Sequence, residues 1–102
     1  MATEYFAFIA EEDYRAFHIL VTTPLPRDYD MWLRVRERGK IRAEIERVAR
    51  VVEIEITPTE FGAYCKQRAR GDFSIAALDG CAREKALARG RAFRAMAATG
   101  SR

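Results

Sequence analysis

The sequence contains little of the chemistry that metalloproteins and nucleotide-binding enzymes need. It has one histidine and two cysteines in 102 residues, and Cys65 and Cys81 form no Cys-x-x-Cys pair. Because a structural zinc ion needs four Cys or His ligands at suitable spacing, a zinc site is excluded. The chain also lacks the glycine-rich patterns that bind phosphates or dinucleotides. We therefore expect no metal and no cofactor.

The sequence also lacks any targeting or membrane segment. Its first ten residues, MATEYFAFIA, have neither the basic start nor the long apolar core of a secretory signal, and no apolar run is long enough to span a bilayer. We expect a cytoplasmic protein without membrane contact, in which both thiols stay reduced. Arg outnumbers Lys fifteen to three and there are seventeen alanines, a bias that we interpret as typical of a GC-rich bacterial genome.

What the sequence does contain is typical of one small globular domain. Apolar residues make up 49% of the chain and charged residues 32%, with a net charge of +3. We expect a single α+β domain over residues 1–90. Residues 91–102 form a basic C-terminal tail, which we expect to fray.

Periodicity predicts two short strands and four helices. Residues 4–10, EYFAFIA, are apolar on both faces of an extended segment, whereas residues 51–57, VVEIEIT, alternate as a half-buried strand does. Helical spacing is expected at about 12–21, 27–49, 58–69 and 74–89, the last ending near Gly90. Residues 12–21 leave an alternative open, because FHILVTT contains β-branched residues and could form a strand.

The clearest local signal is the junction after the second strand. Thr57, Pro58, Thr59 and Glu60 match the capping-box pattern with proline at the first helical position. Ile56 and Phe61 occupy the positions of a hydrophobic staple around that cap. We predict a helix that begins at Pro58.

The segment 27–49 has an apolar stripe that changes sides near Gly39. Tyr29, Trp32 and Leu33 gather on one side of the helical projection, while Ile41, Ile45 and Val48 gather roughly opposite. Either the helix is broken or kinked near Gly39, or one long helix packs its two halves against different things. The second arrangement implies a partner.

Two sets of residues could carry catalysis, and for both a structural role is the better interpretation. Glu53 and Glu55 point the same way on one strand, which suits solvated or salt-bridged surface carboxylates or contacts with an overlying helix. His18 could activate Cys65 as a nucleophile, but no spacing supports the pair and no third orienting group is apparent. The aromatic residues Tyr14, Phe17, Tyr29 and Trp32 are expected to form the core.

Nucleic-acid binding is the alternative function. Helices at 58–69 and 74–89 joined by a turn have the outline of a helix-turn-helix, but Ser74 to Asp79 offer almost no donors for base edges. The basic residues nearby could contact phosphates without reading sequence. They are Lys66, Arg68, Arg70, Arg83, Arg89 and Arg91.

The leading interpretation is a non-catalytic protein-protein interaction or regulatory module that acts as a homodimer. Two strands are few for an independent sheet, so we expect a second copy to complete a shared layer. Sequence-nonspecific binding of RNA or DNA is the alternative.

Overall fold

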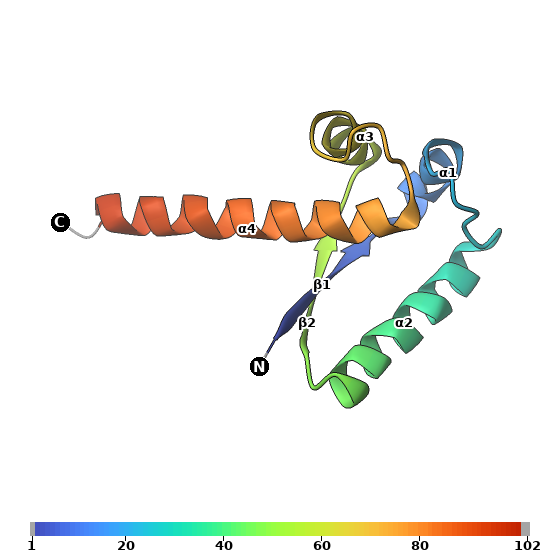
Figure 1. Cartoon of the computed structure of the whole chain (residues 1–102), viewed down its shortest axis with the longest axis horizontal. Coiled ribbons are helices and arrows are strands. Elements are labelled where there is room, and N and C mark those ends of the chain that lie inside the picture. The colour runs from blue at the N-terminus through green and yellow to red at the C-terminus, as the bar shows by residue number, and fades with distance from the viewer. Residues whose placement is uncertain (1, 101–102) are drawn as a thin grey trace.

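In the computed structural model, which describes residues 2–100 and the side chains of residues 2–90, the chain forms an α+β domain (Figure 1). The elements are β1 (Thr3–Phe8), α1 (Glu11–Leu20), α2 (Tyr29–Glu46), β2 (Arg50–Glu55), α3 (Pro58–Gln67) and α4 (Ile75–Gly100). The predicted fold class and the order of its elements are therefore confirmed.

The two strands form a parallel pair that is covered on both faces. β1 pairs with β2 so that Ala7 lies opposite Ile54. Both residues are buried on the face that packs against α4. On the other face lies α2, and Arg47, which directly follows this helix, forms an ion pair with Glu4 at 2.6 Å. Strand β1, which the sequence predicted to be apolar on both faces, is thus covered on both faces by helices of the same chain.

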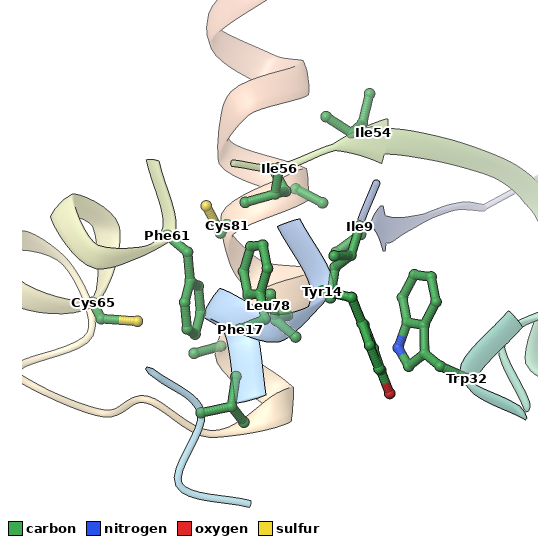
Figure 2. Packing of buried hydrophobic residues seen from close by; sticks show 14 residues of the cluster. Ile9, Tyr14, Phe17, Trp32, Ile54, Ile56, Phe61, Cys65, Leu78 and Cys81 are labelled. Atoms are coloured by element: carbon green, nitrogen blue, oxygen red, sulfur yellow. The ribbon is translucent and has the colours of Figure 1, made fainter. Parts of the chain in front are cut away.

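The core lies where the strand ends meet α1, α3 and α4 (Figure 2). Phe17 of α1 and Phe61 of α3 are fully buried, with ring centroids 5.6 Å apart. Leu78 of α4 lies beside them and is also fully buried. Burial of side chains of this size contributes about 1.5–3 kcal/mol each to folding, so this cluster holds the helices on the sheet.

The start of α3 confirms the predicted capping box. The hydroxyl of Thr57 accepts a hydrogen bond from the Glu60 backbone N–H at 3.2 Å, and the Glu60 carboxylate accepts one from the Thr57 N–H at 2.9 Å. Ile56 and Phe61 are both fully buried, as the staple requires. Local sequence alone therefore determines this helix start.

Residues 11–20 form helix α1, so the strand alternative for FHILVTT is wrong. Three acidic residues, Glu11, Glu12 and Asp13, occupy its first turn, where the helix dipole favours negative charge. Tyr14 and Phe17 point into the core. Burial of these two aromatic rings at helical spacing outweighs the β propensity of the later residues.

Helix α2 continues through Gly39, so the predicted break does not occur. The buried residues of the helix are Trp32 in its first half and Ala43 in its second. Ile41 and Ile45 are instead 47% and 72% exposed. The stripe changes sides because the second half of α2 buries a small residue and leaves its large apolar residues outside.

Helix α4 extends to Gly100, so the predicted end near Gly90 is wrong. A single glycine costs about 1 kcal/mol in a helix, and the many Ala and Arg residues around it have high helix propensity. Figure 1 shows α4 crossing the strands and projecting beyond them. Despite its 26 residues, neither this helix nor another in the described part of the chain is apolar enough to span a membrane. The predicted fraying of residues 91–102 stays a prediction.

Candidate functional site

A largely covered arginine connects the two helices that cover the sheet. The side chain of Arg36 on α2 is only 10% exposed, and its Nη1 lies 3.2 Å from Oδ1 of Asp79 on α4. The same Oδ1 accepts a hydrogen bond from the Ala7 backbone N–H at 2.9 Å. Asp79 therefore links β1, α2 and α4 at one edge of the sheet.

Two aromatic rings surround the Arg36 guanidinium. Its Cζ lies 5.4 Å from the ring centroid of Phe6 and 5.2 Å from that of Trp32, which is the distance of cation–π contacts. Within the described residues, Nε of Arg36 is buried without a hydrogen-bond partner. Such atoms are rare in folded proteins, and here the ring contacts offset part of the cost.

An apolar pocket opens beside Arg36, and we call it the Val35 pocket. It encloses about 230 Å³. Its lining comes from β1, α2, the loop before α2 and the start of α4, and consists of Phe6, Leu25, Pro26, Trp32, Val35, Arg36, Gly39 and Ile75. This volume is below the range of about 300–1,000 Å³ typical of small-molecule sites, so the pocket suits a single side chain better than a cofactor.

Next to the pocket, α2 presents an exposed apolar surface that we call the outer face of α2. Met31 and Val35 are 47% and 51% exposed, and Ile41 and Ile45 continue the surface toward the end of the helix. Arg34, Arg38 and Arg42 are interspersed with these residues and are also exposed. Within residues 2–90, none of these three arginines forms an ion pair.

The second open feature is the edge of β1 that points away from β2. The Arg50 N–H donates to the Ala2 carbonyl and the Ile56 N–H to the Phe8 carbonyl, so even-numbered residues of β1 face β2. The backbone groups of Thr3, Tyr5 and Ala7 therefore point outward. Asp79 binds the Ala7 N–H, while those of Thr3 and Tyr5 have no partner among the described residues. A hollow of about 340 Å³ lies along this edge.

The carboxylates Glu53 and Glu55 lie on the face of β2 that α2 partly covers. Glu53 Oε1 is 3.1 Å from Nζ of Lys40 on α2, so a lysine of the overlying helix contacts this carboxylate. Hydrogen bonds that Lys40 donates to the carboxylates of Glu37 and Glu53 raise its pKa, although burial lowers it. Glu55 is exposed, and its backbone carbonyl accepts a hydrogen bond from Lys85 at 2.7 Å. Both glutamates thus belong to the surface, where the Glu53 carboxylate forms a salt bridge and Glu55 is contacted through its backbone carbonyl.

The structure does not join His18 to Cys65. His18 is exposed, and its Nε2 lies 2.8 Å from the carbonyl oxygen of Pro26. Cys65 is fully buried on α3. In the described part of the chain no hydrogen bond connects the two side chains, so the geometry of a nucleophile and its base is missing.

Burial also makes both thiols poor nucleophiles. Desolvation raises the pKa of Cys65, and the negative charge of Asp72 adds to the effect. Desolvation and the nearby Glu60 carboxylate raise the pKa of Cys81 to about 11. At neutral pH both groups are therefore protonated thiols that pack as small apolar side chains.

The residues predicted to contact nucleic acid are exposed wherever the structure describes their side chains. Lys66, Arg70, Arg83 and Arg89 lie on the surface, and Arg68 forms an ion pair with Glu84 at 2.9 Å. The side chain of Arg91 lies outside the described residues. The first turn of α4, which would have to enter a groove, is instead packed on β1 through Ala77, Leu78 and Asp79.

Sequence reasoning missed Arg36 and Asp79. A weak signal existed, because Arg36 follows Trp32 by one helical turn and so lies on the buried side of α2. Asp79 is also the one acidic residue among the apolar residues Ile75 to Ala82. Neither pattern indicates that the two residues meet across the edge of the sheet.

Among the described residues, no group of three or more His, Cys, Asp or Glu side chains could hold a metal ion. Comparison of the chain with protein-family models, curated proteins and solved structures gives no match.

Proposed function

We propose that the protein is a non-catalytic protein-protein interaction module that acts as a homodimer. The open edge of β1 supports this proposal. A two-stranded sheet is marginal in isolation, and parallel strands normally belong to larger sheets. Here α2 and α4 cover the two faces, so the edge is where another strand can add.

An unpaired strand edge attracts a further strand unless it is blocked. In this chain Asp79 blocks the edge at Ala7, but the N–H groups of Thr3 and Tyr5 and the carbonyls beside them stay open. The hollow beside the edge, lined by Tyr5, Gly80 and Arg83 among others, leaves room for an incoming strand. Pairing of β1 with β1 of a second copy would give a four-stranded sheet around a twofold axis.

The register of this pairing follows from the side chains. A twofold axis at Glu4 would place two Glu4 carboxylates directly opposite each other, which is unfavourable. An axis at Tyr5 places Tyr5 opposite its own copy and Glu4 opposite Phe6. It also lets the Thr3 N–H donate to the Ala7 carbonyl and leaves the Ala7 N–H with Asp79. We therefore place the axis at Tyr5.

Sedimentation equilibrium of the wild-type chain and of Thr3→Pro tests the proposal. Proline removes the outward N–H of Thr3 at the first residue of the strand, where it leaves the bonds to β2 in place. We expect a dimer for the wild type and for the matched control Thr3→Ala, which keeps the N–H. Thr3→Pro should dimerise at least about tenfold more weakly, since it loses two symmetry-related hydrogen bonds. A wild-type chain that stays monomeric up to high concentration would refute the homodimer.

A further inference from the structure

We propose that the outer face of α2 binds an acidic amphipathic helix of a second protein, with one bulky apolar side chain of that helix in the Val35 pocket. This inference rests on the proposed interaction function but not on the homodimer. It concerns the helix that covers the sheet rather than the edge of β1.

The first support is the amount of apolar surface that the outer face of α2 leaves in water. Met31, Val35, Ile41 and Ile45 are each 47% or more exposed on one helix, and Val48 just beyond it is 64% exposed. Residues 31, 35, 38, 42 and 45 follow the three- and four-residue spacing of a single helical stripe. Several exposed apolar residues gathered on one helix face mark a site of interaction, whereas single exposed residues do not.

The second support is charge. Arg34, Arg38 and Arg42 lie along the same stripe, and within residues 2–90 none of them has an ion-pair partner. Lys40, on the opposite side of the helix, is in contrast paired with both Glu37 and Glu53. A complementary partner therefore carries apolar residues with Asp or Glu beside them.

The third support is the Val35 pocket, which continues the outer face of α2 inward. Val35 belongs to both, and Phe6, Leu25 and Ile75 form apolar walls around it. Interfaces of helix-in-groove type are held by one or a few large side chains that fill such pockets. The pocket thus fixes the register of the bound helix, while the arginines fix its orientation.

Charge and shape favour this occupant over the alternatives. Two copies of α2 packed antiparallel would bring the row of Arg34, Arg38 and Arg42 against its own copy, which like charges oppose. A bilayer surface would meet the exposed stripe but has no side chain to fill the pocket. An acidic amphipathic helix can pair with the arginines and also fill the Val35 pocket.

The direct experiment is a display selection against the full chain. The library consists of helical peptides of 18 residues, the length of α2, with a fixed apolar stripe. At each position beside the stripe, the library contains Asp, Glu, Lys, Arg, Ser and Gln in equal proportions. We expect selected peptides to be enriched in Asp and Glu at those positions and to share one large apolar residue.

Binding of the selected peptides can be followed in the pocket itself. Trp32 is the only tryptophan of the chain and lines the Val35 pocket, so its emission should change when the anchor side chain enters. Val35→Glu and the double variant Arg38→Glu, Arg42→Glu should each weaken binding at least about tenfold, whereas reversal of the peptide charges should restore binding to the double variant. The matched control Ile19→Glu changes an apolar residue that is 82% exposed on α1 and should have no effect.

Several outcomes would overturn the inference. They are no enrichment, enrichment of Lys or Arg, equal binding by the double variant, or loss of the dimer in Ile45→Glu, which would mean that a second copy covers the face. Preferential binding of anionic vesicles or of random-sequence RNA through Arg38 and Arg42 would also overturn it. Failure of the homodimer is distinguishable, because Thr3→Pro acts on sedimentation and leaves peptide binding unchanged.

Discussion

Replacement of Asp79 by alanine should destabilise the protein more than its partly exposed position suggests. The carboxylate is 40% exposed, but it pairs with an arginine side chain that is only 10% exposed, and it accepts a hydrogen bond from the Ala7 N–H as well. Hydrogen bonds to charged groups contribute about 1.5–3 kcal/mol each. Because solvent screens the exposed side of Asp79, we expect a loss of about 2 kcal/mol in the free energy of unfolding.

The measurement is urea denaturation followed by far-ultraviolet circular dichroism. For a domain of this size, a loss of about 2 kcal/mol also lowers the melting temperature by about 8–16 °C. Asp79→Asn separates the two contributions, since the amide oxygen can still accept from Ala7 but carries no charge to pair with Arg36. It should lose about half as much stability as Asp79→Ala.

A double-mutant cycle decides whether Arg36 is the cause. Arg36→Met keeps an apolar stem between Phe6 and Trp32 and removes the buried charge. In that background Asp79→Ala should cost about 1 kcal/mol less than in the wild type, because no charge is left unpaired. Equal costs in both backgrounds, or a change below about 0.5 kcal/mol for Asp79→Ala in the wild type, would refute the reasoning.

Four further predictions concern α3 and the thiols. Thr57→Ala removes the hydroxyl of the capping box and should lower the free energy of unfolding by about 1 kcal/mol in urea denaturation, and an unchanged midpoint would contradict the role of the cap. Burial raises the pKa of the Glu60 carboxyl, but hydrogen bonds from Lys85 and the Thr57 backbone outweigh it, so the pKa lies below its ordinary value of 4.5. The stability that ionised Glu60 contributes is therefore fully present above its ordinary pKa and is lost as the pH falls through the lowered pKa. In urea denaturation, the difference in free energy of unfolding between the wild type and Glu60→Gln should shrink from neutral pH to about pH 3. The pKa of Cys81 is raised from 9.0 to about 11 in the folded protein. The free energy of unfolding should therefore fall as the pH rises between these two values, which urea denaturation at a series of pH values would show. At neutral pH, Cys65 and Cys81 should react with a thiol reagent only after the protein unfolds. Rapid reaction of the native protein would contradict their burial.

The local elements of this fold were predictable where neighbouring residues determine them. The start of α3 is an example, since Thr57, Pro58 and Glu60 satisfy one another within one helical turn. The two strands were also predictable, β1 from an extended segment that is apolar on both faces and β2 from its alternation. The ends of α2 and α4 were not, because helix propensity and packing, rather than Gly39 or Gly90 alone, decide whether a helix continues.

The candidate site was predictable only in outline. The sequence showed that the apolar stripe of α2 changes sides, and that observation already implied surface left for a partner. It could not show that Arg36 passes the edge of β1 to reach Asp79, which is 43 residues away. Nor could it show that Val35 lies at the mouth of a pocket built from four separate segments.

The sequence by itself determined the class of this protein, the places where its strands and helices begin, and its poverty in catalytic and metal-binding groups. These properties depend on composition and on contacts within one helical turn or one strand. Only the tertiary structure decided which large apolar residues stay in water, which N–H groups of β1 point away from β2 and which charges pair between α2 and α4. Those properties depend on contacts between segments far apart in the chain, because the burial of any side chain is set by what packs over it.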